Sequence, residues 1–135
     1  MIKRANEMEV LTELCPENGK GLLELVKPSN YFEKPEKLSF FALATLKPGA
    51  EVGYHVHMGE GEMYYVLSGE GVYNDNGKIV PIKTGDVTYC KSGEGHGIEN
   101  TGVEDLIFNA MIIYDWFYAR KDLCLFGYIS LFLLF

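Results

Sequence analysis

Residues 49–69 read GAEVGYHVHMGEGEMYYVLSG, and the fold and the candidate chemistry of the chain follow mainly from this stretch. His55 and His57 lie in a short run that is typical of a β-strand. Side chains alternate across a strand, so two residues at this spacing share a face with Cα atoms about 6.6 Å apart. Two such imidazoles can bind one metal ion. Glu62 follows the loop of residues 58–61, and a reversal of the chain there would place it on a neighbouring antiparallel strand, close to both histidines.

The third histidine, His96, lies in a second glycine-rich segment, residues 91–97, at the head of another short strand. Three imidazoles and one carboxylate form a ligand set suited to a divalent transition metal, with Fe, Mn, Zn and Ni as the candidates. Spacing alone leaves two interpretations open: a metal site, or partly buried histidines with ordinary hydrogen bonds beside solvated glutamates. The chain has only 3 histidines and none lies outside these two segments, which raises the metal site to equal standing with the other interpretation.

The region around the histidines is divided into short runs rich in Val, Ile, Tyr and Phe. Most of the 15 glycines fall between Gly49 and Gly102, and the runs end at glycine, proline or asparagine. Asn76-Gly77 is a strong hairpin signal, since both residues tolerate positive φ. No apolar repeat of helical spacing occurs in this region. An all-β sandwich or small barrel is therefore predicted. The predicted strands are residues 40–46, 51–57, 62–67, 71–74, 78–82, 86–90, 97–100 and 106–114.

Length and charge limit the class of protein. The chain has 135 residues, enough for one domain with a real core, and a hydrophobic fraction of 47% excludes disorder. Its 12 Lys and Arg against 19 Asp and Glu give a net charge of −7. Nucleic acids and anionic membranes require clustered cations, so neither is expected as the main partner. A small molecule is the expected ligand.

Three parts are expected along the chain: an N-terminal arm of strand and loop over residues 1–37, a barrel over 38–115, and an apolar C-terminal extension over 116–135. Residues 123–135 read LCLFGYISLFLLF and carry no charge. As a helix they would reach about 20 Å, short of the ~30 Å hydrocarbon layer, so no membrane span is expected. Three interpretations of the extension stay open: an element that docks on the body or on a second subunit, a non-native extension, or a membrane anchor.

Cysteine usage indicates a reducing compartment. Cys15, Cys90 and Cys124 form no C-x-x-C pair, and the N-terminus has no apolar segment of the kind found in signal peptides. A cytoplasmic location without structural disulfides is expected.

The two glycine-rich segments together resemble the motifs of the cupin superfamily. The first motif, G-x5-H-x-H-x(3,4)-E-x6-G, is matched at every position from Gly49 through His55, His57 and Glu62 to Gly69. The second motif, G-x5-P-x-G-x2-H-x3-N, is matched by Gly85, Gly93, His96 and Asn100. The resemblance implies a six- to eight-stranded β-barrel of jelly-roll type with the metal inside its mouth. It also implies pairing through outer strands, so a homodimer is expected.

One position of the second motif departs from the family pattern. Lys91 stands where the family has a proline, which would stiffen the turn before the histidine by fixing φ. The lysine removes that rigidity and could loosen the loop that aims His96. Lys91 is not a ligand position, so the expected metal site is unchanged.

Strand alternation predicts which side chains surround the site. If Glu62 faces inward, Tyr64 and Val66 do so too, and if His96 faces inward, Ile98 follows. Tyr64, Val66 and Ile98 are therefore expected to line the pocket. The pattern does not assign the faces of residues 106–114.

The resemblance leaves the function open between classes. One hypothesis is a metalloenzyme acting on a small organic molecule, of dioxygenase, decarboxylase, isomerase or lyase type. The alternative is a non-catalytic barrel that binds or senses a small molecule, and a third is a structural barrel that keeps its ligands without using them. Cupins support all three, because a fold does not fix a function.

Overall fold

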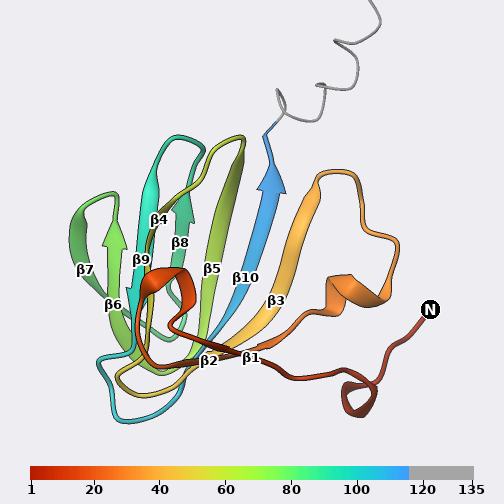
Figure 1. The fold of residues 1–135 in the computed structure, drawn as a ribbon, viewed down its shortest axis with the longest axis horizontal. Helices are drawn as coiled ribbons and strands as arrows, with labels where there is room; N and C mark the ends of the chain where they lie inside the picture. The colour runs from red at the N-terminus through yellow and green to blue at the C-terminus, as the bar shows by residue number, and fades with distance from the viewer. Residues whose placement is uncertain (116–135) are drawn as a thin grey trace, which may run out of the picture.

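The computed structural model describes residues 1–115 and places two antiparallel β-sheets face to face (Figure 1). In the six-stranded sheet the order is β1-β2-β3-β10-β5-β8, and in the four-stranded sheet it is β4-β9-β6-β7. The strands are β1 (Leu11–Leu14), β2 (Leu22–Val26), β3 (Leu38–Leu46), β4 (Glu51–Val56), β5 (Glu60–Ser68), β6 (Glu70–Asp75), β7 (Lys78–Lys83), β8 (Val87–Cys90), β9 (Gly95–Glu99) and β10 (Leu106–Tyr114). Short 3₁₀ turns are η1 (Ala5–Glu7), η2 (Pro16–Asn18) and η3 (Pro28–Tyr31).

All eight runs predicted as strands form strands, β3 to β10, with ends within two residues of those expected. The hairpin between β6 and β7 turns at Asn76 and Gly77, whose φ angles are 49° and 99°. The positive φ values are the reason that this dipeptide closes a two-residue turn. The predicted all-β jelly-roll architecture is confirmed.

The core lies between the two sheets and follows the expected alternation along β5. Glu62, Tyr64 and Val66 are buried, whereas Met63 and Tyr65 point away from the core and are exposed. Apolar side chains of both sheets fill the space between them. The largest side chains that are fully buried are Phe108, Leu46, Ile98, Leu106, His96, Val66 and Asn100.

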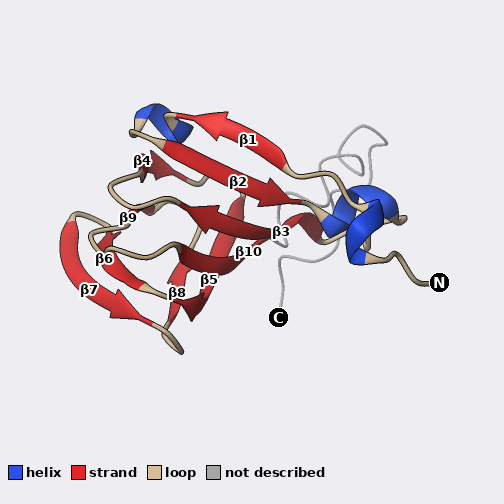
Figure 2. Cartoon of the chain, turned by 90° about the horizontal axis from the view of Figure 1, so that it is seen from below, coloured by secondary structure: helices blue, strands red, loops and turns tan. Residues whose placement is uncertain are grey.

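The N-terminal arm is part of the barrel wall. Strand β2 pairs with β3, and β1 pairs with β2, so both extend the six-stranded sheet at the β3 edge. Reciprocal backbone hydrogen bonds between Lys20 and Glu51, at 3.1 and 2.7 Å, then join the arm to β4 of the other sheet. Figure 2 shows β1 and β2 beside β3, with the turn η2 lying close to β4. The arm therefore connects the open edges of the two sheets.

The turn η2 lies very close to β4, and two glycines make this possible. A Cβ on Gly53 would collide with the backbone oxygen of Glu17, and a Cβ on Gly19 would collide with that of Glu51. Cys15, Glu17 and Asn18 all have positive φ, between 51° and 58°, a conformation that L-residues adopt at a cost. This costly backbone persists because the surrounding structure fixes it.

No helix among residues 1–115 is long and apolar enough to cross a membrane. The apolar C-terminal extension, residues 116–135, lies outside the described residues, and so do the three interpretations of it.

The turn between β5 and β6 provides a test of the packing at the barrel corner. Gly69 and Gly77 both have positive φ, 92° and 99°. A Cβ on Gly69 would lie 2.6 Å from the backbone oxygen of Asp105, whereas a Cβ on Gly77 has nothing within 4 Å. We expect Gly77→Ala to lower the free energy of unfolding by about 1–2 kcal/mol, the cost of a left-handed alanine. Gly69→Ala should lower the free energy of unfolding further, because the backbone at Asp105 must also move to make room for the Cβ. Denaturant unfolding of both variants measures this, and equal losses would contradict the close approach.

Candidate metal centre

The four residues of the expected ligand set come from both sheets. His55 lies on β4 and His96 on β9, and the two residues are direct partners in the four-stranded sheet. His57 follows the end of β4, and Glu62 lies on β5 in the six-stranded sheet. The expectation that Glu62 would lie on a strand next to the histidine strand is therefore wrong. The chain crosses between the sheets after His57, so the carboxylate faces the histidines across the barrel.

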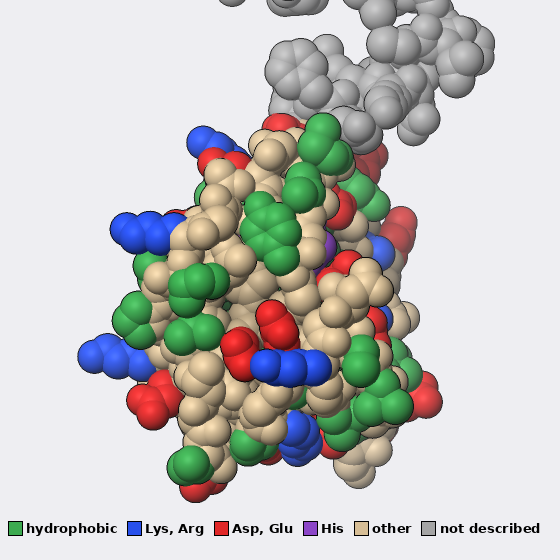
Figure 3. Space-filling model, turned by 60° about the vertical axis from the view of Figure 1, so that its left-hand side comes forward, with side chains coloured by type: hydrophobic (Ala, Val, Ile, Leu, Met, Phe, Trp, Pro, Cys, Tyr) green, Lys and Arg blue, Asp and Glu red, His purple; other side chains and the backbone are tan. Residues whose placement is uncertain are grey.

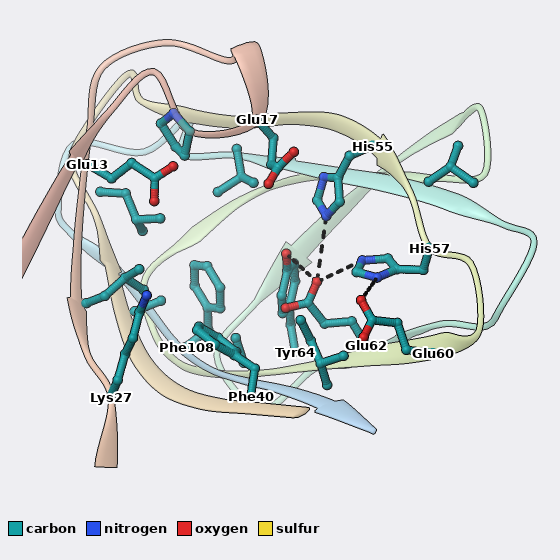
Figure 4. Close-up of a pocket in the computed structure, with 18 residues that line it drawn as sticks. Glu13, Glu17, Lys27, Phe40, His55, His57, Glu60, Glu62, Tyr64 and Phe108 are labelled. Atoms are coloured by element: carbon teal, nitrogen blue, oxygen red, sulfur yellow. Dashed lines mark hydrogen bonds and ion pairs between the residues drawn. The ribbon is translucent and has the colours of Figure 1, made fainter. Parts of the chain in front are cut away.

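These residues, called the metal-ligand cluster below, bring four ligand atoms together in the barrel interior. Glu62 Oε2 lies 3.0 Å from His96 Nε2, 3.1 Å from His57 Nε2 and 3.7 Å from His55 Nε2. The Nε2 atom of His96 lies 3.1 Å from that of His57 and 3.2 Å from that of His55. Figure 4 shows the rings of His55 and His57 pointing at the Glu62 carboxylate. One ligand atom from each residue lies within 4.8 Å of all the others.

This separation fits a shared transition-metal ion. Metal–ligand bonds of about 2.0–2.2 Å, set at tetrahedral or octahedral angles, place neighbouring ligand atoms roughly 3–3.5 Å apart. The donor chemistry agrees, because imidazole nitrogen and carboxylate oxygen are the usual ligands of Fe, Mn, Zn and Ni. A cation also accounts for three imidazole nitrogens that point at one another, an arrangement that hydrogen bonds among them alone satisfy poorly.

Outer hydrogen bonds turn the histidine rings toward this point. His55 Nδ1 lies 2.8 Å from the backbone oxygen of Gly53. A carbonyl only accepts, so Nδ1 donates and the neutral ring keeps its Nε2 lone pair for a metal. His96 Nδ1 lies 2.8 Å from the hydroxyl of Tyr73. Outer partners of this kind fix the tautomer and direction of metal-binding histidines.

The charges within the cluster depend on one another. Burial is the largest influence on Glu62 and opposes its ionisation, but hydrogen bonds from His55, His57 and His96 together outweigh it and hold the pKa of the carboxyl well below its usual value. The hydrogen bond to Glu62 raises the pKa of His57. Burial opposes the charge on His55, yet bonding to Glu62 and to the Gly53 carbonyl leaves its pKa raised. Burial lowers the pKa of His96. The carboxylate is therefore ionised at neutral pH.

Tyr64 packs directly on the cluster. Its hydroxyl donates a hydrogen bond of 3.3 Å to Glu62 Oε2, and its ring stacks on that of His96 with centroids 4.9 Å apart. Burial, together with the charge of Glu62, raises the pKa of Tyr64 well above its ordinary value. Tyr64 thus remains a protonated donor beside the carboxylate.

Comparison with known sequences identifies the family. The profile of the family described as "Cupin domain" matches residues 42–114, which include both glycine-rich motifs and all four residues of the cluster. The chain belongs to the cupin family.

Two relatives of this cupin have names that refer to oxalate. An oxalate-binding protein of Thermotoga maritima is 49% identical over 108 residues, covering 76% of this chain and 89% of the relative. The oxalate decarboxylase OxdC of Bacillus subtilis is 33% identical over 103 residues, covering 73% of this chain but only 26% of that longer protein.

Solved structures agree on the fold. The crystal structure of a protein described as a predicted oxalate decarboxylase from Thermotoga maritima has a TM-score of 0.77 and 45% identity, covering 85% of this chain and all of that one. The cupin domain of Cnp3 from Schizosaccharomyces pombe has a TM-score of 0.65 at 14% identity, covering 85% of this chain and 93% of that one. At that identity the second likeness concerns the fold alone.

A cavity of about 410 Å³ lies beside the cluster, and three of the four cluster residues, His55, His57 and Glu62, line it (Figure 4). Figure 3 shows a small part of a histidine side chain between its neighbours at the surface, so the cluster is not fully enclosed. The remaining lining residues are Glu13, Pro16, Glu17, Leu23, Leu25, Lys27, Phe40, Ala44, Val52, Val56, Glu60, Tyr64, Phe108, Ala110 and Ile112.

The three side chains expected in the pocket lie in different places. Tyr64 lines the cavity. Val66 and Ile98 face inward as alternation predicted, with 0% and 1% exposure, but they lie in the packed core and not among the lining residues. Inward-facing residues of a barrel divide between core and pocket according to their height along the strand, which parity alone does not give.

Sequence reasoning missed two parts of the cavity wall. The arm contributes residues such as Glu17 and Lys27, and no motif in residues 1–37 indicates this. On β10 the lining face is that of Phe108 and Ala110, for which the alternation of burial along the strand is the only signal. That signal in sequence is weak, because both faces of β10 are largely apolar.

Lys91 replaces the proline of the family motif, and hydrogen bonds fix the loop that contains it. The amide of Gly93 donates to the carbonyl of His57 at 2.7 Å, and the amide of His57 donates to the carbonyl of Glu94 at 3.0 Å. Ser92 Oγ accepts a hydrogen bond of 2.8 Å from the amide of Gly59. Lys91 is exposed and pairs with Glu94 at 3.4 Å. The loop that precedes His96 is thus tied to the loop that carries His57.

The raised pKa values predict that protons compete with the metal. The pKa values of His55 and His57 lie above the ordinary value in the metal-free chain, so both imidazoles gain protons as the pH falls. A metal ion that binds at low pH must displace these protons, which weakens its binding. We expect affinity for Zn²⁺ or Mn²⁺ to weaken by at least about tenfold from pH 8 to pH 6. Competition with a chromophoric chelator at each pH measures it. An affinity independent of pH would contradict the assignment of these two imidazoles as ligands.

Proposed function

We propose that this cupin holds one divalent ion, drawn from Fe, Mn, Zn and Ni, at the metal-ligand cluster, and that the loaded site binds oxalate or a closely related small carboxylate. The observation that carries the proposal is the convergence of three imidazole nitrogens and one carboxylate oxygen on one point at the wall of a cavity. The relationship to an oxalate-binding protein over most of both chains supports the ligand class.

The charge of the site is consistent with a carboxylate ligand only when a cation is present. Glu62 contributes one negative charge, and Glu13, Glu17 and Glu60 line the same cavity against a single ammonium, that of Lys27. A divalent ion supplies Lewis-acid attraction for carboxylate oxygens. Oxalate has two adjacent carboxylates that can chelate one metal ion. This chelation offsets the repulsion between the oxalate and the acidic side chains of the cavity wall.

The residues around the cluster have separate roles in this proposal. Tyr64 donates to Glu62 Oε2 and so directs the carboxylate. Phe108, only 1% exposed, excludes water from the floor of the cavity. Glu60 Oε1 lies 3.4 Å from His57 Nδ1 and orients that ring from outside the cluster.

Metal-dependent turnover of the same ligand is the second candidate function. Glu60 and Glu17 are carboxylates that line the cavity without belonging to the cluster, and either can move a proton at a ligand bound there. Decarboxylation of hydrogen oxalate breaks the carbon–carbon bond, moves the proton to carbon, and gives carbon dioxide and formate without a net redox change. The relationship to an oxalate decarboxylase supports it.

Oxalate titration of the metal-loaded chain tests the proposal. We expect one divalent ion per chain by elemental analysis, and oxalate binding by calorimetry that is lost on chelation and restored by the ion. Glu62→Gln should reduce metal affinity by roughly 10- to 100-fold or more. Glu104→Gln, a change on the exposed loop before β10, serves as the matched control and should change neither.

Product analysis of the same samples separates the two candidates. Oxalate binding without formate or carbon dioxide supports a binding protein, whereas formate production that follows metal content supports the enzyme. Oxalate affinity that is unchanged after chelation would overturn both.

The expected homodimer is also a proposal. β8 is an edge strand of the six-stranded sheet, and side chains on the outer face of β5 and β8 include Tyr65, Val87 and Tyr89, which are 47%, 64% and 55% exposed. Apolar side chains beside an unpaired strand edge favour association, and homo-oligomers are most often twofold dimers. We propose that a second copy covers this face.

Light scattering of variants tests the homodimer. The wild-type chain should have the mass of two chains, and Tyr65→Lys should shift it toward one, because an ammonium would be buried in the interface. Val103→Lys, at a loop position that is 89% exposed, is the matched control. A monomeric wild-type chain would overturn the proposal.

The thiols are consistent with the expected cytoplasmic location, which stays a prediction. Cys15 is exposed and Cys90 is buried, and both are free. Burial raises the pKa of the Cys90 thiol to about 11, so this thiol is protonated and unreactive at neutral pH.

A further inference from the structure

We infer that the cavity is built for a carboxylate ligand with an uncharged apolar body, such as a 2-oxo acid carrying an aryl or branched-alkyl group. The carboxylate and its adjacent oxygen would lie at the metal-ligand cluster, and the body would occupy the remainder of the cavity. The inference rests on the proposed metal site and goes beyond oxalate in ligand class.

The size of the cavity is the first argument. At about 410 Å³ it falls in the range of pockets that hold drug-sized ligands, roughly 300–1,000 Å³. Oxalate has six non-hydrogen atoms and needs only a small part of that space. A ligand confined to the cluster would leave most of the cavity to water.

The wall away from the cluster is largely apolar. Leu23 and Leu25 of β2 and Phe108 of β10 line it, with exposures of 6%, 7% and 1%. The space in front of them exists because β3 and β10 carry small residues there. Ala44 is the partner of both Leu25 and Phe108 in the sheet, and Ala110 is the partner of Tyr64. Each methylene buried against such a wall strengthens binding by roughly fourfold.

The distribution of charge disfavours a second carboxylate on the body. Glu13 and Lys27 line the part of the cavity formed by the arm, and their charges cancel. The Lys27 ammonium lies 5.3 Å from the centroid of the Phe40 ring and so already faces an aromatic partner. Glu17 stands beside His55 (Figure 4), where it repels an anionic body near the cluster. An uncharged body meets none of these penalties.

The position of this wall is fixed. β2 is hydrogen-bonded to β3 along its length, and the turn η2 is held against β4 by the Lys20–Glu51 bonds and the close glycine contacts. The apolar wall is thus preformed and does not depend on a ligand to assemble it.

A ligand series tests the inference on the metal-loaded chain. Dissociation constants are measured by calorimetry for oxalate, pyruvate, 3-methyl-2-oxobutanoate, phenylpyruvate and 2-oxoglutarate. We expect affinity to rise from pyruvate through the branched acid to phenylpyruvate, by at least about tenfold overall. The dicarboxylate 2-oxoglutarate should bind no more tightly than pyruvate.

Filling the apolar space should remove this preference. Ala110→Leu and Ala44→Leu extend into the cavity and should abolish the gain of phenylpyruvate over pyruvate. Oxalate binding and the melting temperature show that each variant is folded. Asn109→Leu, on the opposite face of β10, is the matched control and should keep the wild-type ligand order.

The outcomes separate this inference from the proposed function. Oxalate binding with phenylpyruvate no tighter than pyruvate overturns the inference alone. Phenylpyruvate binding without oxalate binding supports the inference and overturns oxalate as the ligand. A metal-loaded chain that binds none of these acids overturns both.

Discussion

The ionised carboxylate of Glu62 in the barrel interior is the constraint on which the site depends. A buried negative charge without partners costs several kcal/mol, so the chain must surround it with positive charge or hydrogen-bond donors. Three imidazoles and the Tyr64 hydroxyl meet this requirement from two sheets. The residues that neutralise the carboxylate are thus the same ones that would hold a cation. Stability and metal binding are coupled at this point, since loss of one histidine leaves the charge less well compensated.

The fold delivers these groups through strand pairing and through two linked loops. Direct pairing of His55 with His96 sets one side of the cluster, and the crossing of the chain after His57 brings β5 to the other side. Hydrogen bonds between the loop at His57 and the loop at Gly93 hold together the end of β4 and the start of β9. Lys91 is compatible with this arrangement because backbone bonds, and not ring rigidity, fix the loop.

Sequence patterns predicted the features that depend only on residues close together in the chain, namely the strands and the faces of their side chains. Glycine-bounded apolar runs gave the eight strands of the barrel, and parity correctly placed Tyr64 and Val66 inward. The sheet that carries Glu62 could not be predicted in this way, because a short loop between strands permits either a hairpin or a crossing. The N-terminal arm was expected, but its place in the cavity wall was missed for a related reason: its contact with β4 depends on Gly53 and on a turn with positive φ, neither of which leaves a periodic signal. Long-range contacts of this kind appear only once the chain is folded.

The wall contributed by the arm has an evolutionary consequence. The segment that matches the family model, residues 42–114, holds all four cluster residues, whereas β1, η2 and β2 lie before it. The arm therefore adds one part of the chamber wall from outside that segment, while β3, β4, β5 and β10 supply most of the rest from within it. Substitutions at Leu23, Leu25 or Lys27 would change the wall of the chamber without replacing any of the four cluster residues. Cupins with the same four cluster residues can therefore differ in the shape of this chamber, and so in the molecules that it admits.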